Sequence, residues 1–190
     1  YFEGKIQHVA ILPFGGRTLT ADLVRGLSIP YAEAQKAKEH YGTAFAQLVD
    51  PRETVEVPGP SPGQKRAVAR ELIAHIIEQR LDEMFGLVQG ELQDRNLIDN
   101  LGAGVVLTGG TVAIPGIVEL AQQIFASPVR LGVPNEGLSG LAESVQRPQF
   151  AIATGLALWG ADRFMETGRG ASTITSGMFT KLGTWLKEFF

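Results

Sequence analysis

The chain has 190 residues, of which 44% are apolar, and a formal net charge of −3. This length allows one buried core or two small ones, and the charge gives no general attraction for nucleic acid. The absence of cysteine excludes disulfides, thiolate chemistry and cysteine-containing metal sites. His8, His40 and His75 lie far apart without metal-ligand spacing, so we interpret them as structural or surface residues.

The chain contains no targeting or membrane-spanning pattern. No apolar run approaches the ~20 residues needed to cross a bilayer, and the first residues lack a basic-then-apolar signal pattern. The sequence begins at Tyr1 and continues directly into a strand pattern. We therefore expect a piece of a longer or processed cytoplasmic protein.

The first third of the chain predicts alternating short elements. Residues 5–12 have a strand pattern that Pro13-Phe14-Gly15-Gly16 ends, and a helix capped by Thr18 or Thr20 follows. A second helix is expected from Pro30 to about His40. Residues 44–49 and 53–57 predict a small hairpin, and the proline-rich residues 58–63 predict an exposed loop.

Residues 65–93 form the longest stretch with helical periodicity. A helical wheel places Arg80 among its apolar residues, and Glu83 lies one turn away. A buried guanidinium needs a charged or planar partner, because desolvating it alone costs several kcal/mol. Two interpretations remain open: an Arg80–Glu83 pair that reaches the domain edge, or a role facing a ligand such as an adenine ring.

Residues 104–116 read G-V-V-L-T-G-G-T-V-A-I-P-G and predict a strand, a glycine turn and a helix. The apolar run 105–107 predicts a strand buried on both faces, and Pro115 suits the first turn of the helix that follows. Gly109 and Gly110 permit either a tight turn or close approach of a nucleotide at the end of the strand. Another strand is expected at 128–133, and residues 146–148 lead into another helix that runs to about Phe164. The order is that of an α/β fold with an insertion.

The end of the chain predicts a linker and an amphipathic helix. Residues 167–177 have no core-forming pattern, so we expect a flexible linker. Thr180, Lys181, Thr184, Lys187 and Glu188 occupy one side of the following helix. The other side is apolar and consists of Met178, Phe179, Leu182, Trp185, Leu186, Phe189 and Phe190. At ~21 Å this helix is too short to span a bilayer but long enough to lie on its surface, with Lys181 and Lys187 beside anionic lipid. Docking back onto the domain is the alternative.

The chain resembles the C-terminal half of the FtsA family, in the actin-like ATPase superfamily. The resemblance covers nearly the whole chain and rests on I-L-P-F-G-G (11–16), V-E-V-P (55–58), I-I-E-Q-R-L-D-E (76–83), V-L-T-G-G-T-V-A-I-P-G (106–116), S-P-V-R-L-G-V-P (127–134) and the terminal W-L-K-E-F-F. It implies an α/β, actin-like (ribonuclease H-like) second half. Residues 1–28 and 101–166 would form the actin-like subdomain and 29–100 an inserted small α+β subdomain containing the long helix. Residues 167–176 would be the linker and 177–190 the membrane-targeting helix.

The resemblance also implies sites and partners. Gly109, Gly110 and Thr111 would lie against the adenosine of ATP, with Arg80 and Glu83 near the adenine, and the missing half would hold most of the Mg and phosphate. The chain alone would then bind ATP poorly and hydrolyse none. Expected partners are the C-terminal peptide of FtsZ, further copies of the chain, other division proteins and the cytoplasmic membrane, with the solvent side of residues 91–95 as the peptide site.

The function predicted from this resemblance is a membrane-tethered, ATP-binding, polymerising protein that anchors the FtsZ ring at the division site. Alternatives are an actin-like pilus-assembly adaptor and half of a sugar kinase-type phosphotransferase. The second alternative requires a catalytic carboxylate, and we identify no acid at a strand end for that role.

Overall fold

The computed structural model describes residues 4–61, 63–98, 101–134 and 142–166. Its elements in chain order are α1 (Gly16–Leu27), α2 (Tyr31–Tyr41), η1 (Ala46–Leu48), β1 (Thr54–Pro58), β2 (Lys65–Ala69), α3 (Arg70–Asp94), β3 (Val105–Leu107), η3 (Gly110–Ala113), α4 (Ile117–Phe125), β4 (Val129–Leu131), α5 (Ala142–Val145), η4 (Pro148–Phe150) and α6 (Ala151–Glu166). The chain divides into two compact units, Tyr1–Gly132 and Val133–Phe190.

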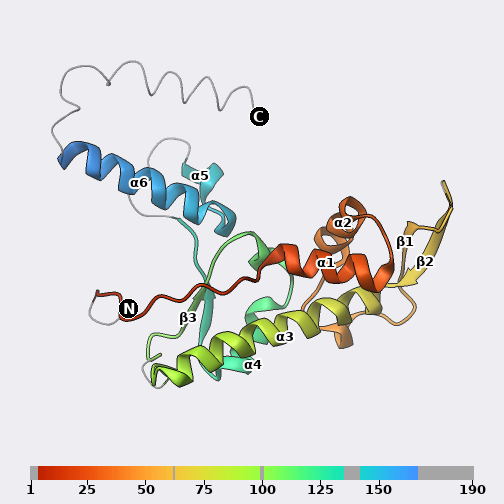
Figure 1. Cartoon of the computed structure of the whole chain (residues 1–190), viewed down its shortest axis with the longest axis horizontal. Coiled ribbons are helices and arrows are strands. Elements are labelled where there is room, and N and C mark those ends of the chain that lie inside the picture. The colour runs from red at the N-terminus through yellow and green to blue at the C-terminus, as the bar shows by residue number, and fades with distance from the viewer. Residues whose placement is uncertain (1–3, 62, 99–100, 135–141, 167–190) are drawn as a thin grey trace, which may run out of the picture. The chain divides into compact units, whose positions relative to one another are not determined.

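Helices α1, α2 and α3 pack against one another in the first unit (Figure 1). Leu19, Leu23 and Leu27 recur every four residues along α1, which places them on one face, and all three are buried. The facing residues of α3 include Ile73, Ile77 and Leu81, also buried. These side chains belong to a single core that extends to Phe125 and Val129. The assignment of residues 29–100 to an inserted subdomain stays a prediction.

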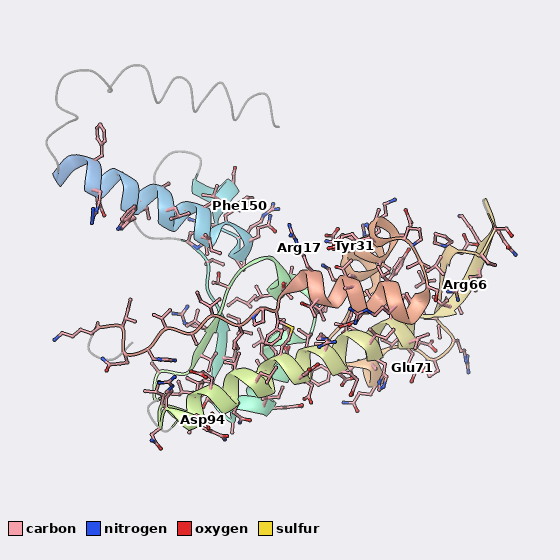
Figure 2. All side chains as sticks on the ribbon, in the orientation of Figure 1. Arg17, Tyr31, Arg66, Glu71, Asp94 and Phe150 are labelled. Carbon is pink, nitrogen blue, oxygen red and sulfur yellow. The ribbon has the colours of Figure 1, made fainter. Side chains whose placement is uncertain are left out.

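Helix α3 is the longest element and begins later than its periodicity predicted. It runs from Arg70, with Glu71 in its first turn, to Asp94 (Figure 2). Lys65–Ala69, predicted as its first residues, instead form β2. Lysine and arginine at 65 and 66 fit the polar side of a helix as well as the exposed side of a strand, so periodicity could not separate the two.

The predicted pairing of residues 44–49 with residues 53–57 was wrong, although the strand expected at 53–57 is present as β1 and belongs to a different hairpin. β1 pairs antiparallel with β2, from Thr54 opposite Ala69 to Pro58 opposite Lys65, and the loop between them contains most of the proline-rich residues. The expectation of a strand at 44–49 was wrong. Residues 46–48 form a 3-10 turn there, because Ala46 and Val49 pack together against Ala74 of α3.

The expected strand at 5–12 was also wrong. Among described residues 4–12, only Lys5 makes an isolated β bridge, and the rest of the stretch has no regular structure. Ile6, Val9 and Ile11 are 60%, 71% and 92% exposed. An extended segment becomes a strand only where a neighbouring backbone pairs with it, and among described residues 4–12 only Lys5 has such a pairing.

Strands β3 and β4 form a parallel pair in which Val105 faces Val129 and Leu107 faces Leu131. The strand at 105–107 is confirmed, but burial on both faces was wrong, because Val106 is 49% exposed. The face of the sheet that carries Val106 is therefore open to solvent.

Helix α4 follows the glycine turn as predicted and connects β3 with β4. Ile117, Leu120, Ala121 and Phe125 are its buried residues, and the Phe125 ring meets the Phe85 ring of α3 edge to face at 5.8 Å. Pro115 was predicted in the first turn of this helix, but it precedes the N-cap residue, Gly116.

The second unit contains α5, η4 and α6. Its long helix begins at Ala151, after a 3-10 turn that Pro148 starts, which agrees with the helix predicted to follow residues 146–148. Within α6, the Arg163 guanidinium lies 5.2 Å from the centre of the Trp159 ring. The predicted linker and the amphipathic helix at 177–190 lie outside the described residues.

Candidate functional site

The predicted glycine turn follows β3 directly. Thr108 donates a hydrogen bond from Oγ1 to the Gly132 carbonyl at 2.9 Å, which ties the end of β3 to the end of β4. Gly109 has φ 100° and ψ 177°, a conformation that is essentially restricted to glycine. A Cβ built on Gly109 or on Gly110 meets no atom within 4 Å. Space is therefore open beside this backbone, and Thr111 comes next in η3.

A second glycine pair, Gly15-Gly16, lies against this turn. Gly16 is the first residue of α1, and a Cβ built on it would lie 2.8 Å from Thr111 Oγ1. Sequence reasoning treated Gly15-Gly16 only as the end of a strand and so missed its place beside Thr111. The available signal was the repetition of a glycine pair shortly after two apolar stretches.

Lys38 of α2 lies beside the Gly15-Gly16 pair. Its Nζ donates to the Gly16 carbonyl at 3.0 Å, to Thr20 Oγ1 at 2.9 Å and to Gln35 Oε1 at 2.9 Å. Burial lowers the pKa of Lys38, and the negative charge of Glu39 opposes that shift. Sequence reasoning missed Lys38, although its position one turn after buried Ala34 was the same kind of signal that identified Arg80.

The first turn of α1 is electrostatically positive. It carries no acidic residue, it includes Arg17, and Lys38 lies beside it (Figure 2). The prediction that Thr18 or Thr20 caps this helix was wrong. The N-cap is Gly15, whose N–H donates to Thr18 Oγ1, while Thr20 bonds to the Gly16 carbonyl. A helix start with nearby cations favours an anionic group.

Arg80 and Glu83 lie in a different part of the first unit. Arg80 makes two hydrogen bonds to the Asp22 carboxylate, at 2.5 Å and 3.1 Å, and one to Glu83 at 2.6 Å. The hydrogen bond to Asp22 is the main cause that raises the pKa of Arg80. Asp22 is six residues beyond Gly16 on α1, so its backbone lies about 9 Å along the helix from Gly16.

The Arg80–Glu83 pair is thus present, and Asp22 is an additional partner that the sequence did not indicate. Asp22 follows Leu19 by three residues and precedes Leu23, so its edge position beside the buried face of α1 was the available signal. Through its hydrogen bonds to Asp22, Arg80 connects α3 to α1. The position of Arg80 and Glu83 near an adenine ring stays a prediction.

The remaining predicted sites are placed as follows. Glu91, in the stretch 91–95, is 2.9 Å from His8 Nε2 and 3.4 Å from Arg95 Nε. Met178, Phe179, Lys181, Leu182, Trp185, Leu186, Lys187, Phe189 and Phe190 lie outside the described residues.

Within the described ranges, no group of three or more His, Asp or Glu side chains could hold a metal ion. No helix of the described part is long and apolar enough to cross a membrane.

Solved structures identify the fold. Crystal structures of MreB5 of Spiroplasma citri match this chain with a TM-score of 0.60 in both the ADP-bound and the AMPPNP-bound forms. Sequence identity is 15% and 16%, and the match covers 84% and 83% of this chain but 48% and 47% of theirs. The chain has an actin-like α/β fold.

Sequence comparisons identify the family within that fold. The family model "Cell division protein FtsA" matches residues 1–155. FtsA of Pseudomonas aeruginosa is 39% identical over 177 residues, FtsA of Neisseria meningitidis 42% over 157, and FtsA of Escherichia coli 30% over 195. These matches cover 93%, 82% and 99% of this chain. The chain belongs to the FtsA family.

The match is to part of each relative. The chain spans 42%, 38% and 46% of the lengths of these three FtsA proteins.

Proposed function

We propose that this chain is the nucleotide-binding second half of an actin-like cell-division protein that polymerises and links the FtsZ ring to the cytoplasmic membrane. The observation that carries the nucleotide part is the contact between two glycine turns, at Gly16 and Thr111, beside the positive start of α1. The similarity in fold to MreB5 in its ADP-bound and AMPPNP-bound forms supports the same proposal.

In this proposal the backbone of Gly109 and Gly110 receives the adenosine of ATP, because the space beside both residues is open. Thr111 supplies a hydroxyl at the same place, and the start of α1 with Lys38 favours the negative charge of the phosphates. Arg80 and Glu83 remain the proposed neighbours of the adenine. Any Mg would be held mainly by residues outside this chain.

Filling the open space tests nucleotide binding. Gly110 and Gly102 both have open surroundings and no left-handed φ, so leucine is tolerated by the backbone at either position. The host for ATP titration is a chimera in which this chain replaces the matching region of the Pseudomonas aeruginosa relative. Gly110→Leu should weaken ATP binding at least about tenfold by occupying the ligand's space, whereas Gly102→Leu should not. Equal affinities in the two variants would exclude Gly110 from the site.

Membrane attachment is proposed for residues 177–190 on the basis of their sequence pattern. Co-sedimentation with vesicles containing anionic lipid measures it on the full chain. Trp185→Glu should reduce binding by about tenfold or more, because it replaces a large apolar side chain with a charge. Thr184→Glu adds the same charge on the polar side and is the matched control. Unchanged binding of the Trp185 variant would refute the anchor.

The proposed protein partners are the C-terminal peptide of FtsZ, other division proteins and further copies of the chain. The proposed location is the cytoplasmic face of the membrane at the division site. Capture of the chimera by an immobilised FtsZ peptide, but not by a scrambled peptide, is expected. Failure of capture with intact nucleotide binding would favour an actin-like adaptor that serves a different partner.

A further inference from the structure

The loop after α2 contacts the end of the glycine turn. The Ala44 N–H donates to the Pro115 carbonyl at 2.8 Å, and Thr43 Oγ1 donates to the same oxygen at 3.3 Å. Pro115 follows η3 by two residues, and η3 contains Thr111. The position of this loop therefore bears on the position of the turn that we propose to bind adenosine.

The other end of the same loop is held by α3. The Ala46 N–H donates to Glu78 Oε2 at 3.1 Å, and Glu78 is half-buried. Ala46 also packs with Val49 and with Ala74, one turn before Glu78. Hydrogen bonds to an ionised carboxylate are stronger than those between neutral groups, so Glu78 is well suited to fix this end of the loop.

Helix α3 therefore contacts, at separate points, the two segments that are linked to the glycine turns. Arg80 binds Asp22 of α1, the helix that begins at Gly16, and Glu78 binds the loop that holds Pro115. Residues two apart on a helix project in directions about 200° apart, so the two contacts leave different sides of α3.

We propose that Glu78 is a positioning residue for the nucleotide site: through the loop 43–46 it holds the turn 109–116 in place against α3. This rests on the proposed function only in naming the turn as part of a nucleotide site. Glu78 contacts no nucleotide in this proposal and acts only through the Ala46 amide and the Pro115 carbonyl.

Amide hydrogen exchange in the full chain tests the proposal without any ligand. Glu78→Ala removes the acceptor, and exchange across residues 111–117 should accelerate about tenfold, the effect of losing one hydrogen bond. Glu78→Gln retains an oxygen acceptor and should restore most of the protection. Glu71→Ala removes an exposed carboxylate from the same helix and should leave these amides unchanged. Peptides from α1 serve as the internal reference for global opening.

Thr43→Val provides a second route if Glu78→Ala fails to fold. Valine keeps the shape and removes the hydroxyl that donates to Pro115 and accepts from the Phe45 N–H, so exchange at 111–117 should again rise relative to α1. Acceleration confined to residues 44–49, with 111–117 unchanged, would overturn the proposal. Because the readout needs no ATP, failure of the nucleotide proposal leaves this result interpretable. If Glu78→Ala in the chimera abolishes ATP binding and Glu78→Gln restores it, the position of the turn and the binding of nucleotide are connected.

Discussion

The two glycine pairs of the first unit have the same composition and different physical roles. At Gly109 the backbone adopts φ 100° with open space around it, whereas Gly16 has no left-handed φ but lies so close to Thr111 that a Cβ would contact its hydroxyl at 2.8 Å. The first position requires glycine for its conformation and the second for its clearance. A glycine pair in a sequence therefore does not distinguish a requirement for backbone conformation from a requirement for space.

The difference matters because the two requirements fail in different ways. A conformational requirement is local, so no change elsewhere in the chain relieves it. A clearance requirement depends on a neighbour, so shortening that neighbour removes it. Substitutions at the two pairs therefore separate the roles.

The largest effect is expected at Gly109. Gly109→Ala forces a Cβ into a glycine-only conformation and should lower the free energy of unfolding by about 1–3 kcal/mol. Gly110→Ala is the matched control, because its surroundings are open and its φ is not left-handed, and it should stay within about 0.5 kcal/mol of the parent. Urea titration of the chain measures both. Equal losses in the two variants would show that conformation is not what distinguishes them.

A smaller and relievable effect is expected at Gly16. Gly16→Ala should cost about 1 kcal/mol by crowding Thr111 Oγ1. Combination with Thr111→Ala, which removes that oxygen, should recover at least about 0.5 kcal/mol as coupling in a double-mutant cycle. Strict additivity would contradict the contact between the two turns.

The smallest effect concerns the charge behind Gly16. Because burial lowers the pKa of Lys38 below its ordinary value of 10.5, the unfolded chain binds this proton more strongly in the pH window just below 10.5. The burial penalty is present at lower pH and is relieved as the pH rises through that window. The free energy of unfolding of the parent minus that of Lys38→Met should therefore increase with pH. Lys36→Met removes an exposed lysine of the same helix together with its surface ion pair to Glu33, and so measures the effect of losing an exposed charge. A flat difference would contradict burial of the ammonium group.

Much of the fold could be predicted from the sequence, because most buried residues recur at regular spacing. Leu19, Leu23 and Leu27, spaced four residues apart, form the buried side of the helix predicted after Gly16, and the unit from Val105 through the glycine turn to α4 was predicted in the correct order. The failures occurred where regular structure depends on a partner. Residues 5–12 had a strand pattern but no paired backbone, and residues 65–69 formed a strand only because β1 pairs with them.

Part of the candidate site could be predicted from the sequence, because some of its residues are neighbours in the chain. Gly109, Gly110 and Thr111 are adjacent in sequence, so their turn was visible as a motif. Gly16 and Lys38 reach it only through the packing of α1 and α2, which no local pattern encodes. Arg80 was correctly singled out as needing a charged partner, but Asp22 is distant in sequence and could be found only in the folded chain.

The uncovered stretch 4–12 affects how assembly experiments on this chain should be interpreted. It presents extended backbone with exposed isoleucine and valine and is joined to α3 by the His8–Glu91 contact. Segments of this kind pair with like segments of other molecules as concentration rises. Light scattering by the 190-residue chain will therefore report non-specific association through this segment as well as ordered filaments. Only the increase in scattering that persists in Ile11→Lys should be counted as polymerisation.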